Sequence, residues 1–337
     1  MFVKISPASN FMSLIKAEDL SKTFKIYSQG EGIRGYLKSF IKRDYEEVHA
    51  VEGLNLEIDE GEMIGYIGSN GAGKSTTVKM LTGILEPSSG EIEVDGRDPH
   101  RHRKKNAMNI GVVFGQKTQL WWDLPVKESF KLLKEIYEVE DEAYDERIDE
   151  FNEVLQLVEF WDQPVRKLSL GQKMRCELAA AFLHHPKIVY LDEPTIGLDV
   201  AVKERIRDFI RKMNEEKDIT VMLTTHDIGD IEDLCERIVV LDAGKKIYDG
   251  SLDKLVNRFS SRRLVMQINR PEEFDLEVDG VKEIKTTEEG LEVVFDREVI
   301  SASDLMRIIL EDYDVQDFQI REPDIEEVVK KVYNEGI

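Results

Sequence analysis

A glycine-rich stretch, GSNGAGKST, follows the apolar run MIGYI and precedes a helix-compatible sequence. It fits the pattern G-x-x-x-x-G-K-[ST] in the strand–loop–helix order of a phosphate-binding loop. Glycines let backbone N–H groups close around phosphate oxygens, and the following helix start adds N–H groups and a positive dipole end. Lys74 can pair with β- and γ-phosphates, and Ser75 can ligate Mg²⁺. A simple glycine-rich turn is the structural alternative, which the flanking strand and helix disfavour. The predicted phosphate site comprises Gly68, Ser69, Asn70, Gly71, Ala72, Gly73, Lys74, Ser75 and Thr76.

Two acidic residues stand at the end of another buried strand. The run KIVYLD ends in Asp192, and Glu193 follows it. Beside a phosphate loop, Asp192 can hold Mg²⁺ directly or through water. Glu193 can then polarise or deprotonate the attacking water. A solvent-facing acid pair is the structural alternative. His226 follows the apolar run ITVMLTT, where it could contact a γ-phosphate or orient Glu193, although a lone histidine is more often structural.

Strand-like and helix-like segments alternate up to about residue 260. Strands are expected at 14–26, on both sides of a turn at Glu60–Gly61, at 91–94, 110–114 and 187–192, and in ITVMLTT, RIVVLD and KKIYDG. Helices are expected at 74–84, within 126–160, and at 170–184, 200–214 and 227–235. This alternation predicts an α/β fold with a mostly parallel sheet.

The pattern changes near NRFSSRR, at 257–263. Strand-like LVMQI, VKEIK and LEVVF follow, then a helix from about Ser303, a strand at 315–320 and a last helix from Asp324. We therefore expect a first domain over 1–260 and a small α+β accessory domain over 261–337. The alternative is a tail that extends the first core. A length of 337 residues is typical of roughly two domains.

Composition excludes several classes of function. With 46 Lys+Arg against 68 Asp+Glu, the net charge is −22, which argues against nucleic acid as the main partner. Two cysteines cannot form a disulfide framework, so a reducing compartment is expected. No apolar run approaches the ~20 residues that span a bilayer, and the first residues lack the apolar core of a secretory signal. Any membrane-embedded work would belong to another chain.

The run KLSLGQKMRCELAAAFLHHPKIVYLDEPTIGLD, at 167–199, strongly resembles the ATP-binding subunits of ABC transporters. The resemblance covers roughly 14–260. It implies the P-loop NTPase fold of ABC ATPases, with a helical subdomain at about 117–180 inside the nucleotide-binding domain. GSNGAGKST matches the family's Walker A motif, and Asp192–Glu193 matches its Walker B pair.

Further matches extend the predicted site. Gln116 in IGVVFGQ matches the Q-loop glutamine, which the family uses in catalysis and near the metal, with Gln119 a weaker candidate. GLD ends in Asp199, which matches the D-loop, and His226 matches the switch histidine. Phe24 in SKTF matches the aromatic residue that stacks on adenine, a role for which a phenyl ring suffices.

LSLGQ, at 168–172, matches the signature motif, except that Leu170 stands where a glycine is usual. Ser169, Gly171 and Gln172 remain, and they head a predicted helix whose N-terminus suits an anion. In the family this motif faces the γ-phosphate held by a second subunit. Since the chain carries one Walker A and one signature motif, the resemblance implies a homodimer with two shared ATP sites.

FGQKTQLWWDLPV and EPTIGLD resemble the ABC-2 exporter branch more closely. That resemblance implies ATP and Mg²⁺ as cofactors, separate transmembrane permease chains as partners, and a cytoplasmic location at the membrane face. A soluble ABC ATPase acting on ribosomes or DNA is the alternative, but it usually has two cassettes or a long coiled coil. A non-enzymatic ATP-gated scaffold is a third possibility, which Glu193 and His226 speak against. The transported substrate is not identified by these residues.

Three segments keep two interpretations each. Trp121 and Trp122 could pack under the helical subdomain, or one ring could anchor a helix of the membrane partner. The 28–48 insertion contains a basic amphipathic helix at 33–45, which could cover the sheet or lie against anionic lipid or a partner. Residues 1–11 precede a second candidate start, Met12, and could be a disordered extension or an artefact of start assignment.

Overall fold

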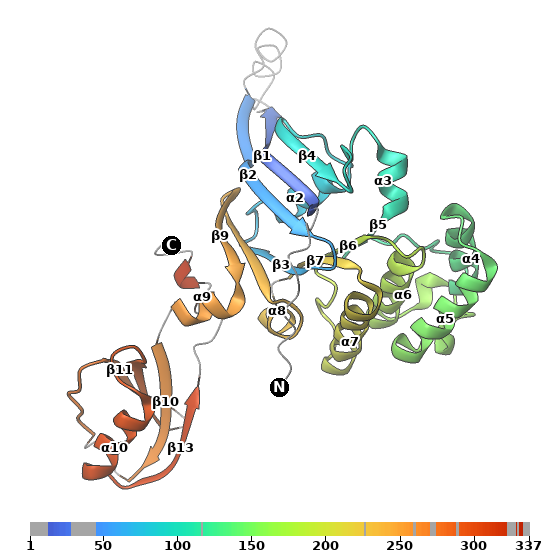
Figure 1. The fold of residues 1–337 in the computed structure, drawn as a ribbon. Helices are drawn as coiled ribbons and strands as arrows, with labels where there is room; N and C mark the ends of the chain where they lie inside the picture. Colours follow the sequence, from blue (N-terminus) through green and yellow to red (C-terminus); the bar gives the residue numbers. More distant parts are fainter. Residues whose placement is uncertain are drawn as a thin grey trace, which may run out of the picture. The chain divides into compact units, whose positions relative to one another are not determined.

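The computed structural model describes residues 13–27, 45–115, 117–225, 227–258, 261–269, 274–287, 290–321, 328 and 330–332. The chain divides into two units, Met1–Asp249 and Gly250–Ile337 (Figure 1). The division precedes the boundary drawn between 260 and 261, since helix α9 (Leu252–Arg258) groups with the second unit. Of the features expected from sequence, Met12 and residues 28–44 lie outside the described residues.

A six-stranded sheet forms the centre of the first unit, in the order β5-β6-β7-β3-β8-β9. Its strands are β3 (Met63–Gly68), β5 (Ile110–Phe114), β6 (Ile188–Asp192), β7 (Thr220–Thr224), β8 (Arg237–Asp242) and β9 (Lys245–Ser251). The pairs β5–β6, β6–β7, β3–β7 and β3–β8 are parallel, as predicted. β7 is buried along its whole length, because parallel strands are covered on both faces. Because β3, β6 and β7 run parallel, their carboxyl ends lie at the same edge of the sheet. The predicted phosphate loop and the two acids follow strands at this edge.

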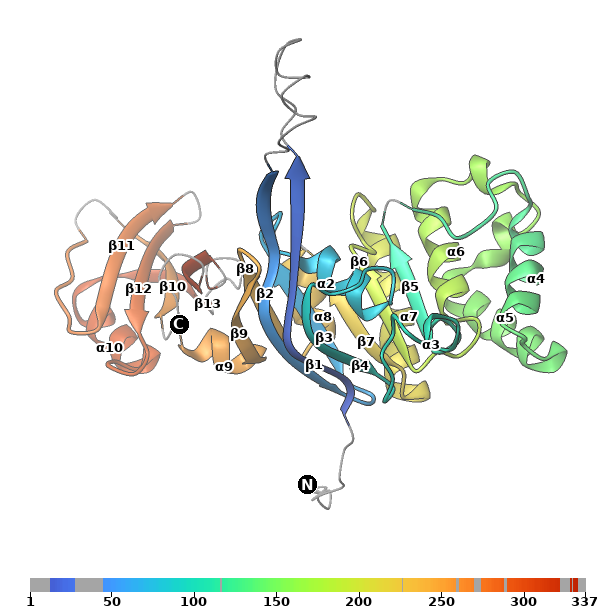
Figure 2. The same ribbon diagram turned by 90° about the horizontal axis from the view of Figure 1, so that it is seen from above.

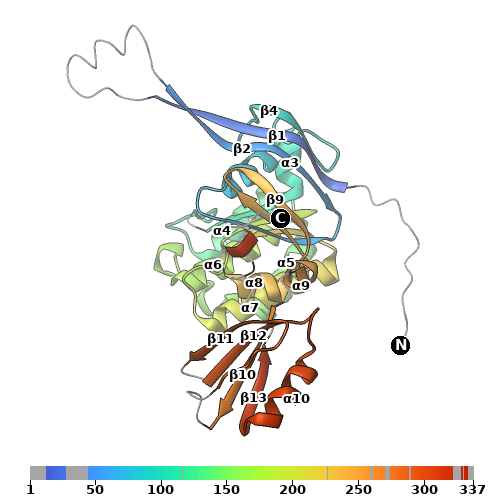
Figure 3. The ribbon, with the colours of Figure 1, turned by 90° about the vertical axis from the view of Figure 1, so that its left-hand side faces the viewer.

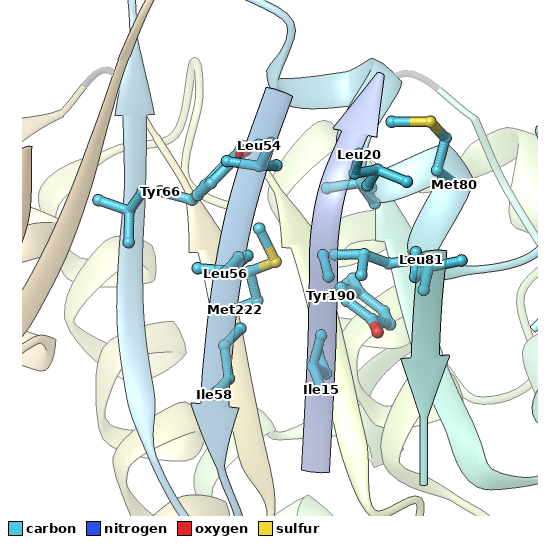
Figure 4. Close-up of a cluster of buried hydrophobic side chains, with 14 of the residues drawn as sticks. Ile15, Leu20, Leu54, Leu56, Ile58, Tyr66, Met80, Leu81, Tyr190 and Met222 are labelled. Carbon is cyan, nitrogen blue, oxygen red and sulfur yellow. The ribbon is translucent and has the colours of Figure 1, made fainter. Parts of the chain in front are cut away.

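A separate three-stranded antiparallel sheet packs on this core, in the order β2-β1-β4. It contains β1 (Ser13–Tyr27), β2 (Tyr45–Asp59) and β4 (Ser89–Val94). The sequence predicted β1, β4 and the second half of β2 as extended, but it did not predict the first half of β2 or a second sheet. Tyr45, expected at the end of the helix at 33–45, is instead the first residue of β2. Leu54, Leu56 and Ile58 alternate with exposed residues on β2, and they face Tyr66 and Met222 of the parallel sheet (Figure 4). The two sheets therefore share one apolar core.

The helices of the first unit are α2 (Lys74–Leu81), α3 (Arg103–Asn109), α4 (Val126–Ile136), α5 (Asp141–Leu155), α6 (Leu170–Phe182), α7 (Val200–Lys217) and α8 (Ile228–Leu234). Short 3₁₀ turns cover Leu157–Phe160 and Val165–Lys167. Helix α2 ends before the predicted residue 84, since Gly83 takes a left-handed conformation (φ 74°). Figures 1 and 2 show α4, α5 and α6 gathered at one side of the unit, away from the antiparallel sheet.

The second unit contains a four-stranded antiparallel sheet, in the order β11-β12-β10-β13. Its strands are β10 (Ser261–Ile268), β11 (Val281–Thr287), β12 (Gly290–Asp296) and β13 (Val315–Arg321). Helix α10 (Ala302–Asp312) lies beside this sheet (Figure 3). Its Leu305, Met306 and Ile309 belong to one buried cluster with Leu264 and Val293 of the sheet. The start of the predicted last helix, at Asp324, lies outside the described residues.

Candidate functional site

The phosphate loop connects β3 to α2. Gly73 has φ 102°, and a Cβ there would lie 2.3 Å from the carbonyl oxygen of Ala50. Gly71 also has a positive φ, 86°. Glycine is therefore required at Gly73 by both conformation and space. The residue that precedes α2 is Gly73, which has no side chain to cap the helix. The start of the helix therefore suits an anion, as phosphate loops require.

Lys74, the first residue of α2, folds back over the loop. Its Nζ donates to the carbonyl oxygens of Gly68, at 2.5 Å, and Ser69, at 3.2 Å. Burial lowers the pKa of Lys74, and the charges of Glu193 and Asp192 oppose that shift. The ammonium group is thus fixed inside the loop, next to the two acids predicted from sequence.

Ser75 on α2 and Asp192 at the end of β6 are distant in sequence but in contact in the structure. The hydroxyl of Ser75 donates to Oδ2 of Asp192 at 3.3 Å, and the hydroxyl of Thr224 donates to Oδ1. Each carboxylate oxygen is therefore oriented by a different element. A hydroxyl and a carboxylate at this spacing are the hard oxygen ligands that Mg²⁺ prefers, so these residues fit that ion.

Glu193 has a left-handed backbone, with φ 55°, which is uncommon for a residue with a long side chain. Its N–H donates to the carbonyl oxygen of Thr224 at 2.8 Å, which ties this conformation to β7. Such strain is typical of functional sites whose surroundings hold one residue in place. Glu193 lines a cavity of about 320 Å³ together with Ser75 and Asp192. The remaining lining residues are Lys79, Ile84, Phe114, Gly115, Lys117 and Ile196.

The helix that carries the signature motif begins as predicted. Ser169 caps α6: its Oγ accepts from the N–H of Gln172 at 3.2 Å, and Gln172 Oε1 accepts from the N–H of Ser169 at 2.9 Å. This capping box leaves the hydroxyl hydrogen of Ser169 able to donate to an anion. A Cβ on Gly171 would lie 3.3 Å from Val202, so Gly171 also serves the packing of α6 on α7. Leu170 sits at the first helical position with 50% of its surface exposed, and it does not disturb the cap.

Comparisons with known proteins point to one family. A family model described as ABC transporter matches residues 51–196. The ABC transporter ATP-binding protein NatA of Bacillus subtilis is 32% identical over 208 residues, which cover 62% of this chain and 84% of NatA. This chain belongs to the ABC transporter family. It is an ATP-binding and ATP-hydrolysing member with the P-loop NTPase fold.

Other relatives widen the functional range of this ABC family. The methionine import ATP-binding protein MetN of Geobacillus kaustophilus is 35% identical over 233 residues, which cover 67% of this chain and 68% of MetN. A dimeric structure of the ATP-binding cassette MJ0796, bound to ADP and Pi after hydrolysis, aligns with a TM-score of 0.59 and 30% identity. That alignment covers 71% of this chain and 98% of the cassette. The ABC family model does not reach the second unit, Gly250–Ile337.

The other predicted ABC motif residues are not among the described residues that line this cavity. Asp199 caps α7, with its Oδ1 accepting from the N–H of Val202 at 3.0 Å. Phe24 lies on β1 with its ring 38% exposed, and the Nζ of Lys22 is 5.5 Å from the ring centre. Gln116 and His226 lie outside the described residues. The described lining of the cavity also contains none of Ser169, Gly171 and Gln172.

The residues beside His226 are held by a buried carboxylate. Asp230 is fully buried and accepts from the hydroxyls of Thr225, at 3.1 Å, and Thr195. Arg207 on α7 donates to the same carboxylate at 2.7 Å. Thr195, two positions after Glu193, and Thr225, the residue before His226 in the sequence, are therefore fastened to one side chain, which sequence reasoning did not identify.

A second buried carboxylate, Glu177 on α6, was also missed. It accepts from the hydroxyl of Thr118 and from the N–H of Gln119 at 3.1 Å, while the side chain of Gln119 donates to the Glu177 carbonyl at 3.0 Å. Burial raises the pKa of Glu177. Gln119 is thus bound to α6 and does not line the cavity, which disfavours it as the Q-loop residue. The acidic residue within the apolar run CELAAAF was the available sequence signal.

Trp121 and Trp122 are both exposed, at 38% and 52% of their surface. Of the two interpretations kept for this segment, burial of a ring under the helical subdomain is therefore wrong for both residues. The Nζ of Lys173 lies 5.3 Å from the ring centre of Trp122, at the edge of α6. Within the part of the chain that is described, we find no helix long and apolar enough to span a bilayer.

Proposed function

We propose that two copies of this chain form the ATP-hydrolysing motor of an ABC-2 type exporter, bound to permease chains at the cytoplasmic face of the membrane. The observation that carries the hydrolytic part is the meeting of Ser75, Asp192 and Glu193 in one cavity beside the phosphate loop. The exporter part is supported by the ABC-2 resemblance of FGQKTQLWWDLPV and EPTIGLD. MetN is named for import, so direction needs its own measurement.

At the proposed site, the phosphate loop binds the triphosphate of ATP through its backbone N–H groups and Lys74. Ser75 and Asp192 would hold Mg²⁺, with Gln116 beside them. The metal ion would neutralise charge on the β- and γ-phosphates. Glu193 accepts a hydrogen bond from the attacking water and takes its proton. We assign His226 to the γ-phosphate side of the site and Phe24 to adenine.

The second copy would complete each site. Ser169, Gly171, Gln172 and Asp199 lie at or beside the starts of α6 and α7, away from the described lining of their own chain's cavity. An exposed helix start with an available hydroxyl suits the γ-phosphate bound by another copy. The dimer of the MJ0796 cassette supports this arrangement. Two chains would then share two ATP sites.

The permease is expected to contact the segment after Gln116. Exposed tryptophan rings are common anchors at protein interfaces. Trp121 and Trp122 lie close to Gln116 in the chain, and Glu177 fastens the intervening segment to α6. A permease helix on this surface would therefore be linked both to the ATP cavity and to the signature helix.

The test begins with the reading frames beside the gene, one of which should encode a chain with roughly six apolar spans. The two chains are co-expressed, purified in detergent and reconstituted in vesicles. We expect a stable complex whose ATPase activity depends on Glu193, and ATP-driven movement of substrate away from the side that carries this chain. Movement toward that side would identify an importer. Stimulation by ribosomes or DNA, without any such membrane chain, would support the alternative class.

A further inference from the structure

The two edges of the C-terminal sheet differ in chemistry. At one edge, β11 carries Lys282, Glu283 and Lys285, and charged residues of this kind discourage pairing with another strand. At the other edge, β13 pairs with β10, and no further strand of the described residues pairs with it. Strand β13 has no lysine and no proline. The edge carries two charges, Asp317 and Arg321, and its register against β10 shifts between Val315 and Asp317. From Asp317 to Arg321, however, the register is regular and the two charges have opposite signs.

Apolar side chains are exposed along β13. Phe318 pairs with Met266, and Ile320 pairs with Leu264, so these side chains point to the face that α10 covers. Met266 and Leu264 are fully buried there, whereas Phe318 and Ile320 are 50% and 42% exposed. Helix α10 thus covers the middle of the sheet but not its β13 edge, which leaves an apolar border beside an open strand.

The sequence of β13 is complementary to itself. Around Gln319 the order is Asp317-Phe318-Gln319-Ile320-Arg321. In an antiparallel pair of two such strands centred on Gln319, Asp317 of each copy lies opposite Arg321 of the other. Phe318 then lies opposite Ile320 on the α10 face. Opposite charges and apolar pairs in directly opposed positions are the contacts that stabilise antiparallel strands.

The backbone agrees with this register. The N–H of Phe318 donates to the side chain of Asp317 at 2.8 Å, as expected for an N–H that faces the open edge. Phe318 and Ile320 would then exchange hydrogen bonds with Ile320 and Phe318 of the second copy, and Gln319 would lie on the two-fold axis between bonded pairs. We infer that β13 is an interface at which two copies of this chain join their C-terminal sheets into one eight-stranded sheet.

A cysteine at position 319 tests the register directly. The native Cys176 and Cys235 are buried, so they do not compete. Opposed residues of a non-hydrogen-bonded antiparallel pair have Cα atoms about 4.5 Å apart, close enough for a disulfide. Gln319→Cys in the full chain should therefore form a covalent dimer on mild oxidation, without nucleotide and in EDTA. The matched control is Gln316→Cys, also exposed on β13, whose two copies would lie about 20 Å apart. Equal cross-linking of both variants, or none at position 319, overturns the proposal.

Charge exchange provides the second measurement. By sedimentation without nucleotide, Asp317→Arg and Arg321→Asp should each weaken self-association at least about tenfold, because like charges then face each other. The double variant, with both substitutions, should recover wild-type association within about threefold. Thermal melting checks that each variant is folded. Failure of the double variant to recover, or a wild-type chain that stays monomeric at every concentration, counts against the interface. Because these experiments contain no ATP, their result is independent of the proposed cassette dimer.

Discussion

The carboxylate of Glu177 accepts a hydrogen bond from the backbone N–H of Gln119 at 3.1 Å, although the two residues are 58 positions apart. The same carboxylate accepts the hydroxyl of Thr118. Helix α6 begins with the signature motif, and Gln119 follows the Q-loop position, so this contact connects the two regions. A buried acid that fastens two functional segments should affect both stability and its dependence on pH.

Glu177→Gln should change the pH dependence of stability. Burial raises the pKa of Glu177 in the folded chain. A raised carboxyl pKa contributes stability that is complete below the unfolded value, about 4.3, and is lost as pH rises through the folded value. The neutral glutamine does not lose this contribution, so the variant should gain stability relative to wild type as pH rises above about 4.3. Thermal melting across this range measures the difference between the two chains.

Two further variants make that measurement specific. Glu177→Ala leaves the Thr118 hydroxyl and the Gln119 N–H without their acceptor, which should cost about 1–3 kcal/mol of unfolding free energy at pH values near 4. This cost relative to wild type should shrink as pH rises, because the wild-type chain then loses stability and alanine does not titrate. Glu216→Gln, at an exposed position of α7, should follow the wild-type pH profile. A difference between Glu177→Gln and wild type that stays constant with pH would show that Glu177 is not a buried titrating group.

Glu193→Gln should retain ATP binding and lose hydrolysis. The substitution keeps the size of the side chain but removes the proton acceptor, and general-base catalysis is worth about 10²–10⁴-fold. The variant should also accumulate as an ATP-bound dimer, which gel filtration with ATP detects. Glu216→Gln is again the matched control and should keep wild-type turnover. If Glu193→Gln hydrolysed ATP at the wild-type rate, the base would have to be another residue.

The sequence predicted those features that depend on neighbouring residues. The β5 strand occupies 110–114 as expected, because a short apolar run between polar segments leaves little choice of boundary. Helix α6 begins at Leu170 as expected, because Ser169 and Gln172 form a local capping box. The phosphate loop followed from a motif whose structural context is fixed. The Ser75–Asp192 contact is an exception to the local rule, because it joins residues 117 positions apart; both residues were expected at the same metal site.

The missed features all depend on long-range pairing. The antiparallel sheet was missed because the sequence of an extended segment does not indicate which other strand it pairs with. Thr224 orients Asp192 across 32 positions, and Asp230 holds Thr195 across 35 positions. The outward orientation of Trp122 depends on how its loop meets α6. None of these contacts leaves a local periodic pattern, so the three-dimensional structure was needed to find them.

Mixing two inactive variants should test the shared site. Lys74→Ala damages the phosphate loop, and Ser169→Arg places a bulky cation at the start of α6. A heterodimer of the two variants contains one site with both lesions and one intact site. ATPase activity should therefore recover partially on mixing, provided that subunits exchange.

The control places both substitutions in one chain and mixes it with wild type. That heterodimer has one lesion in each site, so it should be inactive although it contains the same substitutions. Labelled chains confirm heterodimer formation in both mixtures. Equal activity of the two heterodimers would argue against a site built across two copies.

Trp121→Ala or Trp122→Ala should weaken association with the membrane chain. Loss of a desolvated aromatic anchor costs about 2 kcal/mol or more of binding free energy. Both rings are exposed in the single chain, so the melting temperature should change little, and basal ATPase activity should stay within about threefold of wild type.

The packing control is Trp161→Ala. The ring centre of Trp161 lies 5.0 Å from that of the buried Phe130. That variant should melt earlier, because the half-buried Trp161 loses its contact with Phe130, although the cost should be below the roughly 3–5 kcal/mol of a fully buried ring. Pull-down with the membrane chain and thermal melting on all three variants separate docking from packing. Normal partner binding by both Trp121→Ala and Trp122→Ala would place the permease elsewhere on the surface.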